Sequence, residues 1–229
     1  MKFSAVAFDL DGTLYPNFRF YIRLVPFLLK ELRLLTALGK ARTQLRRSYL
    51  DSPEVSAVDS KEEFYDVQAR IMSRILGKPA EVIKDKTEKL IYRGWEPIFR
   101  KVRLFSHVLE TLDAFRANGV KMGLLSDFPP ETKLENLGIG GYWDAVICSE
   151  QTGRLKPDKK PFFDLAEKMG LPAKEILYVG NSISYDVKGA FMAGMKSALV
   201  RPKWKKFPSV KEANFIFYNY RQLRDYVLS

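Results

Sequence analysis

The sequence predicts an α/β protein whose parallel sheet is interrupted, after the first strand, by an all-helical insert. Three observations lead to this prediction. Residues 3–8 form a short apolar run that suits a buried strand. Residues 17–103 show no strand alternation and read as helices. From residue 104 onward, apolar runs of strand length alternate with amphipathic stretches, which is typical of right-handed βαβ units with helices on both faces of the sheet.

The insert is expected to contain four helices, separated at glycine and proline positions. A single glycine, Gly39, is predicted to divide the first helical stretch into two, and proline-containing segments separate the later helices. The predicted helices are Phe18–Ala37, Gly39–Leu50, Lys61–Leu76 and Pro79–Tyr92.

The remaining elements belong to the sheet and its covering helices. Three predicted helices each end at a glycine: Ser106–Asn118, Pro161–Met169 and Asp186–Ala193. The predicted strands are Val120–Ser126, Trp143–Ser149, Glu175–Gly180, Lys196–Val200 and Asn214–Phe217, and a short helix closes the chain. We therefore expect a discontinuous core at 1–16 and 104–229, with a helical cap domain at 17–103 over the carboxyl ends of the strands, where such sheets bind ligands.

Composition places the protein in a reducing compartment. Cys148 is the single cysteine among 229 residues, so an intramolecular disulfide is excluded. The first apolar run is too short and too soon interrupted by Asp9 to be a signal peptide, and no stretch reaches the ~20 apolar residues of a membrane span. We expect a cytoplasmic protein.

The charge is strongly basic and unevenly distributed. Of the net +11, residues 17–103 carry +8, because they hold 19 of the 38 basic residues and only 11 of the 27 acidic ones. Such a surface attracts anionic substrates. The basic and aromatic stretch Phe18–Leu50 could also lie on an anionic membrane, but we favour a helix packed on the core. We expect no stable membrane association and no nucleic-acid binding, since no recognition motif accompanies the charge. A monomer or a dimer is expected.

Asp9 and Asp11 directly follow the first strand, in the sequence Phe8-Asp9-Leu10-Asp11-Gly12-Thr13. Two carboxylates this close repel each other unless a cation intervenes, and Mg²⁺ together with a substrate phosphate is the usual solution. One carboxylate can then attack phosphorus, while the other protonates the leaving oxygen and later activates water. Taken alone, an Asp-x-Asp pair is more often an Asx turn.

Three downstream features strengthen the interpretation, because each follows a predicted strand or opens a helix at the same edge. Ser126 can offer its hydroxyl, together with the Asp127 amide, to phosphoryl oxygens. Lys156, followed by Pro157, can neutralise the carboxylates and the phosphate. The segment 180–186 brings Asn181 and Asp186 to this edge.

In this order, these motifs resemble the haloacid dehalogenase-like (HAD) superfamily, in the subfamily with an α-helical cap between motifs one and two. The resemblance covers the whole chain and implies a Rossmann-like core and a Mg²⁺-dependent phosphatase acting on a small anionic phosphorylated substrate. It implies that Asp9 is the nucleophile and Asp11 the general acid/base. Ser126 orients the phosphoryl group and Lys156 stabilises it. The implied metal ligands are the Asp9 carboxylate, the Asp11 carbonyl and the acidic loop with Asn181 and Asp186.

The chain departs from this family's pattern at two positions. Asn181 stands where the family usually has Asp, which removes one negative charge from the metal site. Asp127 stands where Asn or Gly is frequent, and we expect its amide to act while its side chain points away. Because of Asn181, a non-catalytic binding protein on the same fold stays an alternative. A sugar-phosphate mutase is a second alternative, whereas Asp11 argues against a dehalogenase.

Candidate substrate residues lie near the hinges and breaks of the cap. They are Arg19, Arg23, Arg93 and Trp95, together with Asp127. Each of the cap residues also fits a purely structural role. His107, the single histidine, is predicted to lie on a helix surface, which argues against histidine-based catalysis.

Overall fold

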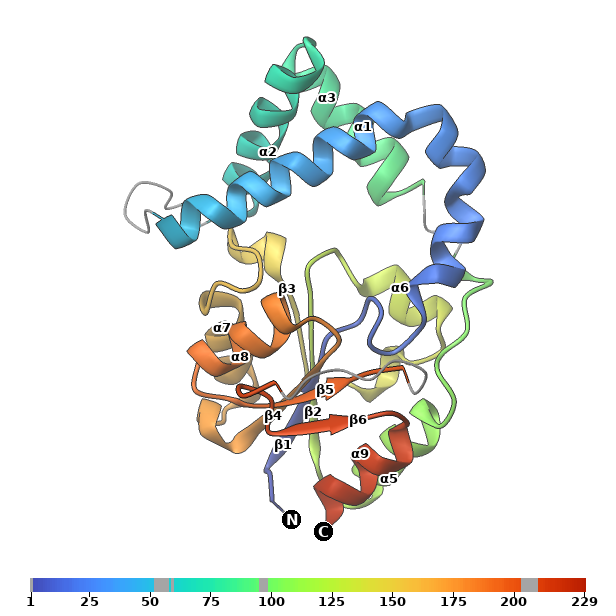
Figure 1. Ribbon diagram of the computed structural model, residues 1–229, viewed down its shortest axis with the longest axis vertical. Helices are drawn as coiled ribbons and strands as arrows, with labels where there is room; N and C mark the ends of the chain where they lie inside the picture. Colours follow the sequence, from blue (N-terminus) through green and yellow to red (C-terminus); the bar gives the residue numbers. More distant parts are fainter. Residues whose placement is uncertain (1, 52–57, 59, 95–98, 203–209) are drawn as a thin grey trace.

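Six parallel strands form one sheet in the order β3-β2-β1-β4-β5-β6 (Figure 1). The computed structural model describes residues 2–51, 58, 60–94, 99–202 and 210–229, apart from the side chains of 19–21, 23, 24, 26–29 and 49–51. The strands are β1 (Ala5–Phe8), β2 (Lys121–Ser126), β3 (Ala145–Cys148), β4 (Ile176–Gly180), β5 (Lys196–Val200) and β6 (Phe215–Phe217).

The two faces of the sheet are covered by different helices, as the alternation of strand side chains requires. Val6 and Phe8 of β1 pack against α5 (Val108–Ala117) and α9 (Tyr220–Leu228). Ala5 and Ala7 point to the opposite face, where α7 (Lys160–Met169) and α8 (Lys188–Met192) pack. All four residues of β1 are fully buried, so this central strand is apolar throughout.

β1 lies at the switch point of the sheet. It pairs with β2 on one side and with β4 on the other, and the later strands extend outward from these neighbours. Because all strands are parallel, the loops that follow them meet at one edge of the sheet. This edge faces the helical insert (Figure 1).

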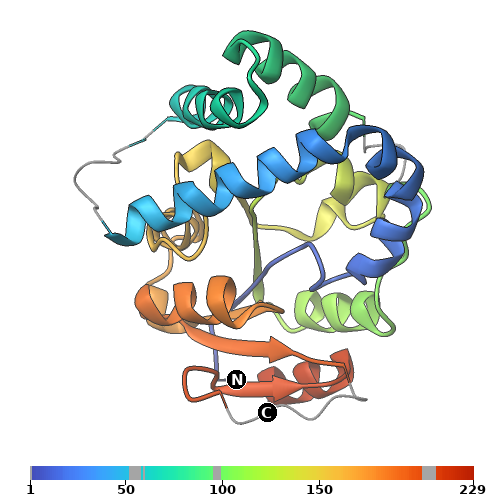
Figure 2. The ribbon, with the colours of Figure 1, turned by 45° about the horizontal axis from the view of Figure 1, so that its top comes forward.

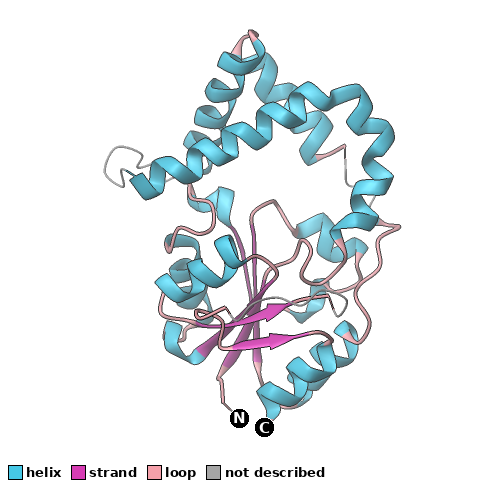
Figure 3. Cartoon of the chain, viewed as in Figure 1, coloured by secondary structure: helices cyan, strands magenta, loops and turns pink. Residues whose placement is uncertain are grey.

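In the described part of the insert the chain forms helices and loops, and the strands lie in the core (Figure 3). α1 (Asn17–Asp51) runs across the carboxyl edge of the sheet (Figure 2), followed by α2 (Lys61–Leu76) and α3 (Ala80–Thr87). A π-helical turn, Glu88–Tyr92, continues α3. Helices α1 to α3 share an apolar cluster that also contains Leu155 of the core. The insert therefore packs directly beside Lys156. Nowhere in the described ranges does a helix have both the length and the apolar character needed to cross a membrane.

Two predicted helix boundaries are wrong, and one helix was not predicted. α1 continues through Gly39 without a break, because one glycine weakens a helix by only about 1 kcal/mol. The kink lies instead at Glu31, whose φ and ψ are −119° and 24°. The helix expected from Asp186 begins earlier, as a π-helical turn over Ile183–Val187. The missing helix is α6 (Glu131–Asn136), which is only six residues long. The other strand and helix ends lie within about two residues of the predicted ones, as is usual for boundaries.

Candidate active site

The first loop of the site begins at Asp9, directly after β1. The Asp9 amide donates to the carbonyl of Val179 at 2.9 Å, so the backbone stays paired up to this residue. The Thr13 hydroxyl donates to Oδ2 of Asp9 at 2.6 Å. Between them, Gly12 has a φ of 86°, and a Cβ there would collide with the side-chain amide of Asn181. A glycine is needed at this position for both reasons.

Lys156 connects the carboxylates that follow β1 and β4. Its Nζ lies 2.7 Å from Oδ1 of Asp9, 2.7 Å from Oδ1 of Asp186 and 3.2 Å from the Tyr178 hydroxyl. Only 3% of the lysine side chain is exposed. Burial alone would lower the pKa of Lys156, but Asp186 and Asp9 raise it well above its ordinary value. The ammonium group therefore remains charged between the two carboxylates.

Asp9 has an unusual acidity for an aspartate. Burial raises its pKa from 3.8 to about 7, against the opposing effect of Lys156 and with a further contribution from Asp186. A carboxyl group that titrates near neutral pH beside one buried cation is characteristic of catalytic sites.

The carboxylate of Asp11 is held by partners other than those of Asp9. Both of its oxygens lie 2.8 Å from Nζ of Lys133 on α6, and the Tyr15 hydroxyl donates to one of them. Lys133 also lies over the Phe128 ring, 5.3 Å from its centroid. Lys133 was not predicted as a site residue, because α6 is short. The two prolines before Glu131 are the signal that could have placed a helix start there.

Ser126 is the last residue of β2 and Asp127 follows it, and their side chains have different hydrogen-bond partners. The Ser126 hydroxyl oxygen accepts the Phe128 amide at 3.2 Å, which leaves its proton for another acceptor. The Asp127 carboxylate accepts from Ser149 at 2.7 Å, from the Lys156 amide at 3.2 Å and from Arg46 at 2.6 Å. Burial would raise the pKa of Asp127, but nearby cations, Arg46 foremost, hold it well below its ordinary value.

Asp186 stabilises the loop after β4. Its Oδ2 accepts the amides of Asn181 at 3.1 Å and Ser182 at 2.9 Å, while Oδ1 contacts Lys156. The loop packs so closely that a Cβ on Gly180 would overlap the Asp186 side chain. Both carboxylate oxygens of Asp186 therefore already have partners within the protein.

The donors that remain at this edge fit Mg²⁺, though with fewer charges than three aspartates would give. Among the described residues, no three acidic, histidine or cysteine side chains converge on one point. The Asn181 amide group lies 3.4 Å from the carbonyl oxygen of Asp11, and Asn17 approaches the same oxygen at 3.4 Å. An amide can turn its oxygen toward a cation. The Asp9 carboxylate, the Asp11 carbonyl and Asn181 thus offer the oxygen ligands that Mg²⁺ prefers.

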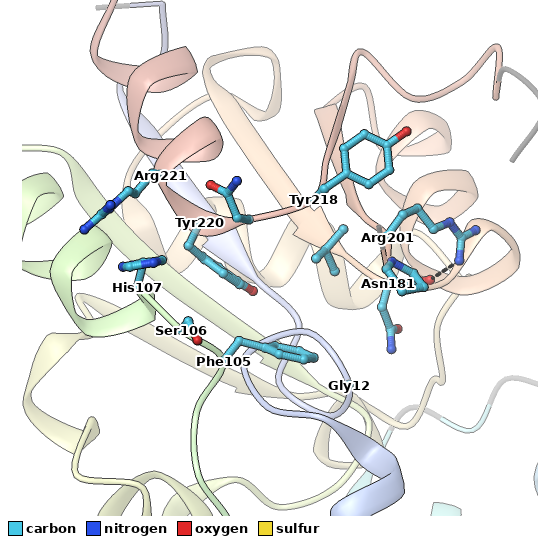
Figure 4. Close-up of a pocket in the computed structure, with 12 residues that line it drawn as sticks. Gly12, Phe105, Ser106, His107, Asn181, Arg201, Tyr218, Tyr220 and Arg221 are labelled. Atoms are coloured by element: carbon cyan, nitrogen blue, oxygen red, sulfur yellow. Dashed lines mark hydrogen bonds between the residues drawn. The ribbon is translucent and has the colours of Figure 1, made fainter. Parts of the chain in front are cut away.

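A cavity of about 680 Å³ adjoins this group (Figure 4). Gly12 and Asn181 lie at one end of it, and Arg201 donates to the Asn181 carbonyl at 3.2 Å. Phe105 and Tyr220 line its centre. The cavity leaves space next to the loops after β1 and β4.

The predicted substrate residues of the cap have different outcomes. Arg93 is exposed and pairs with Glu88 at 3.0 Å, which gives it a surface role. The side chains of Arg19 and Arg23 and the whole of Trp95 lie outside the described residues. The insert instead brings Arg42 and Arg46 of α1 to the site, and neither was predicted.

His107 is not within a helix, contrary to the prediction. It precedes α5 in the left-handed region with a φ of 67°, and its ring lies 3.0 Å from Glu110. It also lines the cavity described above.

Comparison with known proteins gives the chain a family. The family model for haloacid dehalogenase-like hydrolases matches residues 3–194. A glyceraldehyde 3-phosphate phosphatase of Methanocaldococcus jannaschii is 32% identical over 130 residues, which are 55% of this chain and 57% of that protein. The chain thus aligns with little more than half of that relative. The phosphoglycolate phosphatase of Escherichia coli K12 is 29% identical over 217 residues, covering 84% of this chain and 79% of the relative.

Solved structures show the same fold. A HAD phosphatase from Thermococcus onnurineus superimposes with a TM-score of 0.64 at 23% identity, covering 99% of this chain and 98% of that one. The HAD-hydrolase YfnB from Bacillus subtilis, bound to magnesium, gives a TM-score of 0.65 at 15% identity and covers all of both chains. At these identities the likeness concerns the fold alone.

Proposed function

Because the chain belongs to the haloacid dehalogenase-like hydrolases, we propose that it is a Mg²⁺-dependent phosphatase of small phosphorylated metabolites, with Asp9 as the nucleophile. The observation that carries this proposal is the buried Asp9–Lys156–Asp186 arrangement at the carboxyl end of β1, with 2.7 Å between Lys156 and each carboxylate. A buried ion pair contributes little net stability, so its presence at a sheet switch point favours a functional role.

Transfer of the phosphoryl group from the substrate to Asp9 would form one bond and break one. An oxygen of Asp9 attacks phosphorus, the bond between phosphorus and the ester oxygen breaks, and the leaving oxygen takes a proton from Asp11. Ser126 and the Asp127 amide donate to the phosphoryl oxygens, and Lys156 offsets their charge.

Hydrolysis would then regenerate Asp9. Water attacks the phosphorus of the aspartyl-phosphate and loses a proton to Asp11, and the bond to Asp9 breaks to release inorganic phosphate. To reach either reacting oxygen, the Asp11 side chain has to leave Lys133, which holds both of its oxygens in this structure.

The metal site is proposed on the oxygen donors of the chain. Mg²⁺, when bound, would add positive charge beside the phosphoryl oxygens. We assign its protein ligands to the Asp9 carboxylate, the Asp11 carbonyl and the Asn181 side chain, and we assign Asp186 to holding Lys156.

The substrate class follows from charge and from the relatives. The net charge of +11 favours anionic substrates, and the phosphatases similar to this chain are named for phosphoglycolate and glyceraldehyde 3-phosphate. These two compounds are the first to test. The lone cysteine, Cys148, is buried and unpaired, in keeping with an activity in the cytoplasm.

A screen of phosphorylated metabolites, run with and without Mg²⁺ beside the Asp9→Asn variant, tests the proposal. We expect Mg²⁺-dependent release of phosphate that Asp9→Asn abolishes. Activity that survives this substitution would sink the mechanism. Conversion of a sugar phosphate to its isomer without phosphate release would identify the mutase alternative.

One observation supports a second candidate, a non-catalytic binding protein. Asn181 leaves Asp9 as the one carboxylate in the assigned ligand set, which lowers the expected metal affinity. Binding of phosphorylated metabolites without turnover across the screen, at high Mg²⁺ concentration, would favour this candidate.

A further inference from the structure

We propose that Arg46, which α1 contributes from the insert, is a positioning residue of the phosphoryl-transfer site: it neutralises Asp127 and keeps the Asp127 carboxylate off the phosphoryl group. The inference rests on the proposed function, because Ser126 and the Asp127 amide are its phosphate donors. It gives the insert a role in the site through a residue that was not predicted from the sequence.

The Arg46 side chain touches all three loops that follow β2, β3 and β4. Its Nη2 lies 2.6 Å from Oδ2 of Asp127, and its Nε donates to the carbonyl of Lys156 at 2.9 Å. The guanidinium also stacks over the ring of Tyr185, 4.4 Å from the centroid. Its side chain is 14% exposed, so these contacts are made largely out of water.

Arg42, one turn earlier on the same face of α1, cannot replace it. Its Nη2 donates to the Asp127 carbonyl at 3.1 Å but lies 3.9 Å from the carboxylate. Its Nη1 pairs with Glu150, which is fully buried and also accepts the Tyr65 and Tyr92 hydroxyls. Arg42 is thus committed to Glu150, and Arg46 is the closest counter-charge of Asp127.

A counter-charge is needed because the Asp127 carboxylate lies next to the proposed phosphate-binding groups. Asp127 follows Ser126 directly, and the same residue that offers its amide to the phosphoryl group carries a partly buried carboxylate. A fixed negative charge at this distance repels a phosphate dianion strongly in a partly desolvated site. Arg46 cancels that charge, and by holding Oδ2 it keeps the carboxylate on the side of α1.

The test is the affinity for inorganic phosphate, measured by titration calorimetry at a fixed excess of Mg²⁺. We expect Arg46→Gln to weaken phosphate binding about tenfold or more, because Asp127 loses its closest counter-charge. Arg46→Gln combined with Asp127→Asn is expected to regain most of that loss, since both charges are gone. Arg46→Lys is expected to keep most of the affinity through its charge.

Arg47→Gln is the matched control. Arg47 is the next residue of α1, it is exposed, and it forms no ion pair with another described residue. Its substitution removes the same charge from the same helix and is expected to leave phosphate affinity within about twofold of wild type, since exposed charges are screened by salt.

Each outcome decides the inference. Equal phosphate affinity for Arg46→Gln and wild type overturns it, as does an equal loss in the single and double variants, or a wild type that binds no phosphate. If Arg46→Gln does not fold, Asp127→Asn alone decides: binding at least as tight as wild type supports the inference, and weaker binding overturns it. A wild type that hydrolyses no ester defeats the proposed function, while the phosphate affinities still test Arg46.

Discussion

Burial of the Asp9 carboxyl group makes the stability of the fold depend on pH. In the folded protein its pKa is raised by burial to about 7, whereas the ordinary value is 3.8. Between pH 3.8 and about pH 7, Asp9 holds a proton in the folded protein that it has released in the unfolded chain. Binding of this proton favours the folded state. Its contribution to the free energy of unfolding is fully present below pH 3.8 and is lost as the pH rises through about 7.

This difference predicts that Asp9→Asn stabilises the metal-free protein at pH 8. The gain should reach a few kcal/mol and shrink toward pH 4, because asparagine cannot ionise. Urea unfolding in a chelating buffer at several pH values measures it. A difference between wild type and variant that is the same at every pH would contradict the assigned acidity of Asp9.

Asn181 predicts the strength of the metal site. Asn181→Asp adds a second carboxylate to the assigned ligands and should raise Mg²⁺ affinity about tenfold or more, with no substrate present. Titration calorimetry with Mg²⁺ alone is the measurement, and Asn181→Ala, which removes the side-chain oxygen, is the control with the opposite expected sign. Equal affinities of all three proteins would remove Asn181 from the metal site.

Short motifs in the sequence were enough to predict that some residues lie together at the candidate site. Asp9, Lys156 and Asp186 each follow a strand, so a parallel sheet necessarily brings them to one edge, and their contacts at 2.7 Å agree with that expectation. Arg46 and Lys133 could not be found this way. Each reaches the site from another element, and the contact depends on how helices pack, which no local pattern encodes.

At the level of elements, α1 contributes a buried ion pair to the contact between the insert and the core. Arg42 pairs with Glu150, which has no exposed surface, and burial raises the pKa of Glu150 against the effect of Arg42. Removing one partner of such a pair leaves an uncompensated buried charge.

Arg42→Met should therefore destabilise the protein by about 3–5 kcal/mol in urea unfolding, and Arg42→Met with Glu150→Leu should recover a large part of this. The matched comparison is Lys84→Met, whose pair with Asp66 is exposed on both sides and should be worth less than about 1 kcal/mol. Similar losses for Arg42→Met and Lys84→Met would show that α1 is not anchored through Glu150.

The same helix shows why some boundaries were predictable and others were not. Lys61–Leu76 was predicted at its observed ends, because Ser60 caps its start and Gly77, with a φ of 66°, ends it. Gly39 was wrongly predicted to break the helix. Packing of the residues on both sides outweighs the low helix propensity of a single glycine. The kink lies at Glu31, whose side chain pairs with Lys86 of α3, a contact that local sequence does not reveal.

For the whole molecule, discontinuity was visible in the sequence, because a strand pattern before residue 17 resumes only after residue 103. The observed insert between β1 and β2 has this form. What the sequence could not provide is the face that α1 turns toward the loops, and therefore which of the insert's many arginines lie at the site.

The net charge of +11 predicts a salt dependence. For a dianionic substrate, kcat/KM should fall several-fold when salt is raised from low to about 0.5 M, while kcat changes little, because screening weakens attraction at a distance. Steady-state kinetics over a salt series measures this. A kcat/KM that is independent of salt would show that the basic surface does not assist substrate capture.

In the proposed reaction, the phosphoryl group is transferred to the carboxylate of Asp9 before water releases it. Its most direct test is to stop a reaction with substrate during turnover, reduce any acyl phosphate with borohydride and sequence the amino-terminal peptide by mass spectrometry. We predict homoserine, the reduction product of an aspartyl-phosphate, at position 9 and unmodified aspartate at position 11. Substrate hydrolysis with no reduced residue at position 9, together with full activity of Asp9→Asn, would contradict the account.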